Sequence, residues 1–267
     1  MKQTERLLQI MAKLRDPEGG CPWDLEQDFS TIVPYTIEEA YEVADAIAKD
    51  DRAALKEELG DLLLQVVFHS QMAKEEGSFT FEEVAEAISD KMVARHPHVF
   101  GDADVRDAEA QTRAWEEQKA AERAAKGEGE SVLDGVALAL PAITRAEKLQ
   151  KRAARIGFDW PNSRAVIAKV QEETLELQEE LARDELRQSA IEEEYGDLLF
   201  AVVNVGRHIG GEKDAETILR NANAKFERRF RHVESQLKRL AIPMGSATLA
   251  QMESLWEEAK IMEKTAA

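Results

Sequence analysis

The chain has 267 residues, which suits one large domain or two domains of ordinary size. Hydrophobic residues make up 43% of the chain and charged residues 33%, but aromatic residues only 6%, a balance that favours amphipathic helices over a β-sandwich. The formal net charge of −18 argues against a nucleic acid polymer as partner, because such binding needs a basic face.

The first half of the chain is predicted to be helical. Apolar residues recur with helical spacing between Leu7 and Leu14. Thr36 and Glu39 have the spacing of a capping box, which predicts that an acidic helix starts at Thr36. The next helix is expected at 55–72. The side chains expected on its buried side are Leu59, Leu62, Leu63, Val66 and Val67.

A further helix is expected at 81–95, and Pro97 should end it because proline disfavours helical geometry in the residue before it. Two glycines within the charged segment 126–131 mark a flexible linker. We therefore expect a first domain at 1–125 and a second at 132–267. The helices expected in the second domain span 166–181, 191–208, 215–240 and 248–260.

Four blocks of residues recur in the same order in both halves. Glu38, Glu39 and Glu42 return 134 positions later as Glu172, Glu173 and Glu176. Glu58 and Asp61 return after 136 positions as Glu194 and Asp197. Lys91 and Arg95 return after 134 positions as Lys225 and Arg229, and Trp115 returns after 141 positions as Trp256. One block could match by chance among so many glutamates, but four in order predict two tandem all-α bundles of roughly four helices each.

The acidic blocks predict two clusters of carboxylates. Residues three apart on a helix share a face, so two packed helices would bring four carboxylates together in each half. The second set is Glu173, Glu176, Glu194 and Asp197, and the first is Glu39, Glu42, Glu58 and Asp61. A solvated glutamate face is the alternative reading. However, Asp61 and Asp197 directly precede apolar runs, and an unpaired charge beside buried surface is costly.

The ligand chemistry favours a hard divalent cation. Like charges at short range repel strongly, and a bound cation would resolve that conflict. Ligand sets made only of oxygen suit Mg²⁺, with Mn²⁺ as an alternative. Di-iron bundles use Glu-x-x-His pairs and zinc sites use cysteine or histidine, and neither pattern accompanies these carboxylates. We therefore expect a metal site that handles a phosphate-containing substrate, with one carboxylate left to orient or deprotonate water.

Basic and aromatic residues recur with the acidic ones. Lys225 and Arg229 lie four apart on one helical face and could neutralise phosphate oxygens; the alternative is a surface ion pair, which contributes little energy. Trp256 could stack on a nucleobase, or simply pack into a helix interface. Trp23 and Trp160 precede the two acidic helices and are expected in the core.

Several features point to the cytoplasm. Cys21 is the only cysteine, which excludes an intrachain disulfide and fits a reducing compartment. The first fifteen residues are charged and contain no apolar signal core. The apolar runs 62–64 and 198–203 are too short to span a bilayer, so we expect no membrane contact.

Over nearly its whole length the chain resembles the MazG nucleoside triphosphate pyrophosphohydrolases of the all-α NTP pyrophosphatase superfamily, in their two-copy bacterial form. The runs that carry this resemblance are LRDPEGGCPWD at 14–24, TIEEAYEV at 36–43, ELGDLLLQVVFH at 58–69, ARHPHVFGD at 94–102 and KFERRF at 225–230.

This resemblance implies hydrolysis of NTPs and dNTPs to the monophosphate and pyrophosphate, with water attacking the α-phosphorus and Mg²⁺ bridging the triphosphate oxygens. By position it implies that Glu173, Glu176, Glu194 and Asp197 hold the metal. It implies a nucleotide site lined by Lys169, Glu172, Glu173, Glu193, Lys225 and Arg229, with Trp256 on the base. It also implies a homodimer with sites completed across subunits, which fits a small bundle with exposed apolar faces.

The second repeat is expected to be the catalytic one. In two-copy members of the family, activity is associated mainly with that copy. Here His96 and Pro97 should stop the helix after Arg95, whereas the chain continues as a helix beyond Arg229. Two other readings stay open: a non-catalytic regulatory protein that binds nucleotide or metal, and a helical interaction protein whose glutamates are only solvated.

Overall fold

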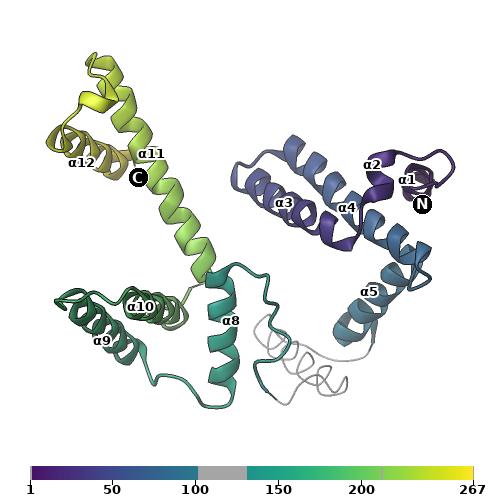
Figure 1. Cartoon of the computed structure of the whole chain (residues 1–267), viewed down its shortest axis with the longest axis horizontal. Helices are drawn as coiled ribbons and strands as arrows, with labels where there is room; N and C mark the ends of the chain where they lie inside the picture. Colours follow the sequence, from purple (N-terminus) through teal and green to yellow (C-terminus); the bar gives the residue numbers. More distant parts are fainter. Residues whose placement is uncertain (1, 102–130, 212, 267) are drawn as a thin grey trace. The chain divides into compact units, whose positions relative to one another are not determined.

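The structure is a computed structural model that describes residues 2–101, 131–211 and 213–266. As the sequence predicts, the elements in these segments are helices, and none of the described residues forms a strand (Figure 1). The chain divides into two compact units, 1–122 and 123–267. Trp115 and residues 126–130 lie outside the described residues, so the predicted linker and the first tryptophan block stay predictions.

The first unit is built around a pair of long acidic helices. Its helices are α1 (Lys2–Leu14), α2 (Pro22–Glu26), α3 (Phe29–Ala48), α4 (Arg52–Glu75), α5 (Phe81–Arg95) and α6 (Pro97–Phe100). α3 packs along α4, and α1 and α5 also pack against α4. The buried core of this unit consists of Met11, Ile32, Val67, Phe68 and Met72.

The start of α3 differs from the prediction. Thr36 does not cap the helix, because Asp28 caps it eight residues earlier: its side chain accepts hydrogen bonds from the backbone N–H groups of Ser30 and Thr31. Thr31 completes the capping box. Thr36 lies inside the helix, where its hydroxyl is 3.1 Å from His69 Nε2 of α4 and so helps to join the two helices.

The end of α5 agrees with the prediction. The helix spans Phe81–Arg95, and Thr80 with Glu83 forms a capping box at its start. His96 leaves helical geometry with φ −125° and ψ 56°, as expected for a residue before proline. By contrast, the helix that carries Arg229 continues to Arg239, so the two repeats differ at this point as the sequence predicts.

The second unit repeats the acidic helix pair and adds a long helix that leaves it. Its elements are α8 (Ala142–Arg155), α9 (Ser163–Leu181), α10 (Gln188–His208), α11 (Ala215–Arg239), the short 3-10 helix η1 (Met244–Ser246) and α12 (Leu249–Ala266). α9 packs along α10, and α8 packs against α10 and α11. In Figure 1, α11 runs away from the α9–α10 pair, and α12 lies against its far part.

Many apolar side chains expected in the core are exposed in the single chain. Leu59 and Leu63 are 50% and 41% exposed, although Val67 on the same helix is fully buried. Trp23 and Trp160 are also exposed, so the prediction that they belong to the core is wrong. The physical reason is that, among the described residues, no other element of the same unit covers these faces. None of the helices described here is long and apolar enough to cross a membrane.

Candidate metal and nucleotide site

Three carboxylates converge where α9 packs on α10. Glu173 comes from α9, and Glu194 and Asp197 lie three residues apart on one face of α10. One oxygen from each of the three lies within 4.8 Å of the other two. Glu173 is only 5% exposed, so the cluster reaches into the helix interface. A carboxylate in that position needs a positive partner, because its charge is poorly solvated.

Lys169 supplies part of that positive charge. It lies one helical turn before the acidic triplet of α9, and its Nζ is 2.7 Å from both Glu172 Oε1 and Glu173 Oε1. Hydrogen bonds from Lys169 to Glu172, and then to Glu173, raise the pKa of the ammonium group above its usual value. Three of the predicted nucleotide-site residues are thus already in contact in the single chain.

The fourth predicted ligand, Glu176, lies outside the close group. Partial burial, followed by repulsion from Glu173, raises the pKa of Glu176. The pKa of Glu194 is raised for the same two reasons, in the same order. The carboxylates therefore share one electrostatic environment, and three of them each place an oxygen within 4.8 Å of the others.

The first unit contains a matching cluster. Glu39 of α3 and Glu58 and Asp61 of α4 also place one oxygen each within 4.8 Å of the others, and Glu42 lies outside that group. Burial, followed by the charge of Asp61, raises the pKa of Glu39. Burial, followed by the charge of Glu42, raises the pKa of Glu58. The duplication therefore extends from the sequence to the arrangement of the carboxylates.

The two clusters differ in their basic neighbour. The position that corresponds to Lys169 in the first repeat, 134 residues earlier, is Tyr35. Its ring packs edge-on against Trp23, with 6.0 Å between the ring centroids. The first cluster therefore has an aromatic side chain where the second has an ammonium group, and it cannot offer the same charge to a triphosphate.

Arg229 of α11 and Trp256 of α12 form a second group, and Lys225 lies about one helical turn before Arg229 on α11. The guanidinium carbon of Arg229 lies 5.7 Å from the centroid of the Trp256 ring. The part of α11 that carries α12 projects away from the α9–α10 pair (Figure 1). α12, which carries Trp256, packs against α11, whereas the carboxylate cluster lies between α9 and α10. In the first repeat, Lys91 and Arg95 lie near the end of α5.

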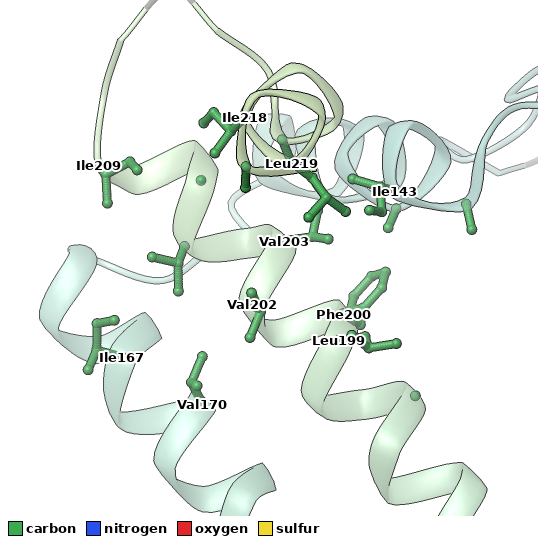
Figure 2. Close-up of a pocket in the computed structure, with 17 residues that line it drawn as sticks. Ile143, Ile167, Val170, Leu199, Phe200, Val202, Val203, Ile209, Ile218 and Leu219 are labelled. Carbon is green, nitrogen blue, oxygen red and sulfur yellow. The ribbon is translucent and has the colours of Figure 1, made fainter. Parts of the chain in front are cut away.

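The large hollow of the second unit is a different feature. It measures about 750 Å³ and lies among α8, α9, α10 and α11 (Figure 2). Its lining consists only of apolar side chains and glycines, including Ile143, Ile167, Leu199 and Leu219. A triphosphate needs charged or polar partners, so this hollow does not suit it. It is an uncovered part of the helix faces.

Two contacts of the α11–α12 group were missed by the sequence reasoning. Phe226 packs against Trp256 with 5.2 Å between ring centroids and is 57% exposed. Glu263 accepts hydrogen bonds from Arg228 and Arg229. A signal for Glu263 was present, because it follows Trp256 by seven residues and so lies about two turns along the same face of α12.

Comparisons with known proteins agree with this duplicated arrangement. The model of the MazG nucleotide pyrophosphohydrolase domain matches the chain twice, at residues 27–100 and 162–234. The nucleoside triphosphate pyrophosphohydrolase of Escherichia coli (strain K12) is 51% identical over 98% of this chain and 99% of its own length. The nucleoside triphosphate pyrophosphohydrolase/pyrophosphatase MazG of Thermotoga maritima is 40% identical over 98% of this chain and 97% of its own. The uncharacterized protein YabN of Bacillus subtilis is 42% identical over 96% of this chain but only 51% of its own.

Proposed function

The chain belongs to the MazG nucleotide pyrophosphohydrolase family, and on that premise we propose that its second repeat hydrolyses nucleoside triphosphates to the nucleoside monophosphate and pyrophosphate. The similarity to two full-length enzymes of that name supports the activity. The observation that carries the choice of repeat is the contact between Lys169 and Glu173, because only the second cluster has this ammonium group.

The donor set of the second cluster fits Mg²⁺. Glu173, Glu194 and Asp197 offer only oxygen ligands, and their oxygens are close enough to share one ion. Burial, followed by repulsion from Glu173, raises the pKa of Glu194, and a divalent cation would offset that repulsion. When bound, such a cation supplies charge that stabilises the phosphate oxygens during transfer. Mn²⁺ has the same preference for these ligands.

The remaining residues act on the substrate and the water. Lys169 neutralises a phosphate oxygen while it stays close to Glu173. Glu176 lies next to the close group but outside it, so we assign its carboxylate to orient the attacking water and accept its proton. The water attacks the α-phosphorus and pyrophosphate leaves. Glu172 and Glu193 border this site from α9 and α10.

We further propose that the site is completed by a second copy of the chain. Lys225, Arg229 and Trp256 suit a triphosphate and a base, but they lie on α11 and α12, and Figure 1 shows α11 running away from the α9–α10 pair that carries the carboxylates. The helix faces around the cluster expose large apolar side chains, such as Tyr195 at 53% and Leu199 at 49%. A homodimer would cover these faces and bring α11 of one subunit toward α9 and α10 of the other.

One experiment tests the choice of site. Pyrophosphate release from mixed dNTPs with Mg²⁺ is measured for the wild type, Glu173→Gln and Glu39→Gln. We expect Glu173→Gln to lose about a hundredfold or more of kcat, since a buried metal ligand is removed. Glu39→Gln is the matched control at the corresponding position of the first repeat and should stay near the wild type. Undiminished activity in Glu173→Gln would overturn the proposal.

A further inference from the structure

We propose that Glu263 is a positioning residue of the nucleotide site, which holds the guanidinium group of Arg229 against the ring of Trp256. This inference rests on the proposed function, because it takes Arg229 and Trp256 as the groups that meet the nucleotide. It adds a carboxylate from α12 that contacts no carboxylate of the metal cluster and acts only through Arg229.

The contacts of Glu263 are directional. Its Oε2 lies 2.8 Å from Arg229 Nε and 2.8 Å from Arg229 Nη2, so one edge of the guanidinium group is bound to a single oxygen. Its Oε1 accepts from Arg228 Nε at 2.8 Å. A guanidinium group held along one edge has a defined plane, and its opposite edge then points in a defined direction.

Burial distinguishes the two arginines. The side chain of Arg229 is 19% exposed, whereas that of Arg228 is 62% exposed. A largely exposed ion pair constrains its partners weakly, so Arg228 contributes little to the geometry. Arg229 is enclosed between Glu263 and the Trp256 ring, at 5.7 Å from the ring centroid, and is therefore the group whose position the carboxylate sets.

The spacing along α12 explains how this helix supplies both the ring and the carboxylate that contact Arg229. Trp256 and Glu263 are seven residues apart, about two helical turns, so both side chains face α11. In the sequence of the first repeat, Trp115 and Glu122 are also seven residues apart. Both of these residues lie outside the described residues. The tryptophan and the glutamate therefore recur together in the sequence, as expected for two residues that act together.

The physical consequence concerns binding more than turnover. An arginine that is already oriented loses less conformational freedom when it meets a phosphate, so the complex forms at lower nucleotide concentration. Loss of the carboxylate should therefore raise KM and leave kcat nearly unchanged. If Glu263 merely competed with the phosphate for Arg229, its loss would lower KM.

The test uses the full-length protein and measures pyrophosphate release from dATP with Mg²⁺. We expect Glu263→Gln to raise KM by about three- to tenfold, with kcat within about twofold of the wild type. Arg228→Gln removes the other partner of the same carboxylate and serves as the matched control, with KM within about twofold of the wild type. In an Arg229→Gln background, Glu263→Gln should add no further rise in KM.

The outcomes separate this inference from the proposed function. If Arg229→Gln raises KM but Glu263→Gln leaves it unchanged or lowers it, the positioning role is overturned and the proposed site stands. If Glu263→Gln raises KM equally in the wild type and in the Arg229→Gln variant, the positioning role is also overturned. That result would mean that Glu263 only joins α11 to α12. If Arg229→Gln itself leaves KM unchanged, the proposed nucleotide role of Arg229 fails, and this inference fails with it.

Discussion

Lys169 Nζ lies 2.7 Å from Glu173 Oε1, whereas the corresponding position of the first repeat holds Tyr35, whose ring packs against Trp23 instead. In each repeat one oxygen from each of three carboxylates lies within 4.8 Å of the other two, and the second cluster differs in having an ammonium group beside it and in the deeper burial of Glu173. A triphosphate carries several negative charges and needs cationic partners besides a metal. This difference is the reason why we propose that the repeat with the ammonium group carries out the hydrolysis.

Replacement of this lysine should impair the enzyme. Lys169→Met keeps the length of the side chain but removes the charge beside Glu173 and the phosphate, and we expect kcat/KM to fall by about tenfold or more. Lys49→Met is the control, because Lys49 forms an exposed ion pair with Asp45 on α3 and touches neither cluster. Steady-state kinetics with dATP and Mg²⁺ measure the effect. A kcat/KM equal to that of the wild type would mean that Lys169 is not part of the site.

Metal binding should be visible without substrate. A ligand that binds only the folded state stabilises it, by about 2.7 kcal/mol at a hundred times its Kd. Mg²⁺ alone should therefore raise the thermal midpoint of the wild type, and EDTA should reverse the rise. In a Glu39→Gln/Glu173→Gln double variant each cluster has lost one of its three close ligands, so most of the shift should disappear. A double variant that Mg²⁺ stabilises as strongly as the wild type would place the ion elsewhere.

A site shared between subunits predicts complementation. At a dNTP concentration well below KM, Glu173→Gln and Arg229→Ala should each retain little activity alone, because each lacks one side of the site. In a mixed dimer, one of the two shared sites has both sides intact. Since statistical mixing makes half of the dimers mixed, co-refolding equal amounts should restore about a quarter of the wild-type activity. Sites contained within a single chain would restore none, and the activity of the mixture would then equal the average of the two variants.

Asp159 should stabilise the second unit in a pH-dependent way. Its carboxylate accepts hydrogen bonds from Arg207 and His208 of α10, and the bonds from Arg207 contribute most to lowering its pKa from 3.8 to about 2. A depressed pKa in the folded state adds stability above pH 4, and this contribution is lost as the pH falls toward 2. Asp159→Asn should therefore lower the free energy of unfolding by about 1–2 kcal/mol at pH 7.

The measurement is urea unfolding of the wild type and Asp159→Asn at pH 7 and at pH 3. The difference between the two proteins should shrink at pH 3, because at that pH the Asp159 carboxyl group is largely protonated in the unfolded chain, whereas in the folded protein, with a pKa of about 2, it is still mostly charged. Asp184→Asn, in the turn that follows α9, is a control at an exposed position. A difference that does not change between the two pH values would mean that the Asp159 contacts do not depend on its charge.

The helices could be predicted because their signals are local. The span of α5 agrees with its predicted bounds, since Thr80 caps its start and Pro97 stops it, and both effects act within one helical turn. The start of α3 could not be predicted from Thr36 and Glu39 alone, because Asp28 offers a stronger cap eight residues earlier. Two local signals competed there, and only the folded chain shows which one is used.

The sequence by itself determined the duplication, the all-α class, the oxygen-only ligand chemistry and the pairing of carboxylates on one helix face, because each depends on residue type and short spacing. Only the tertiary structure decided which carboxylates meet, since the contact of Glu173 with Glu194 and Asp197 requires α9 to pack on α10 in one register. It also decided that Arg229 binds Glu263 and stacks on Trp256, away from the cluster. Such contacts join residues far apart in the chain, and their geometry follows from how whole helices pack.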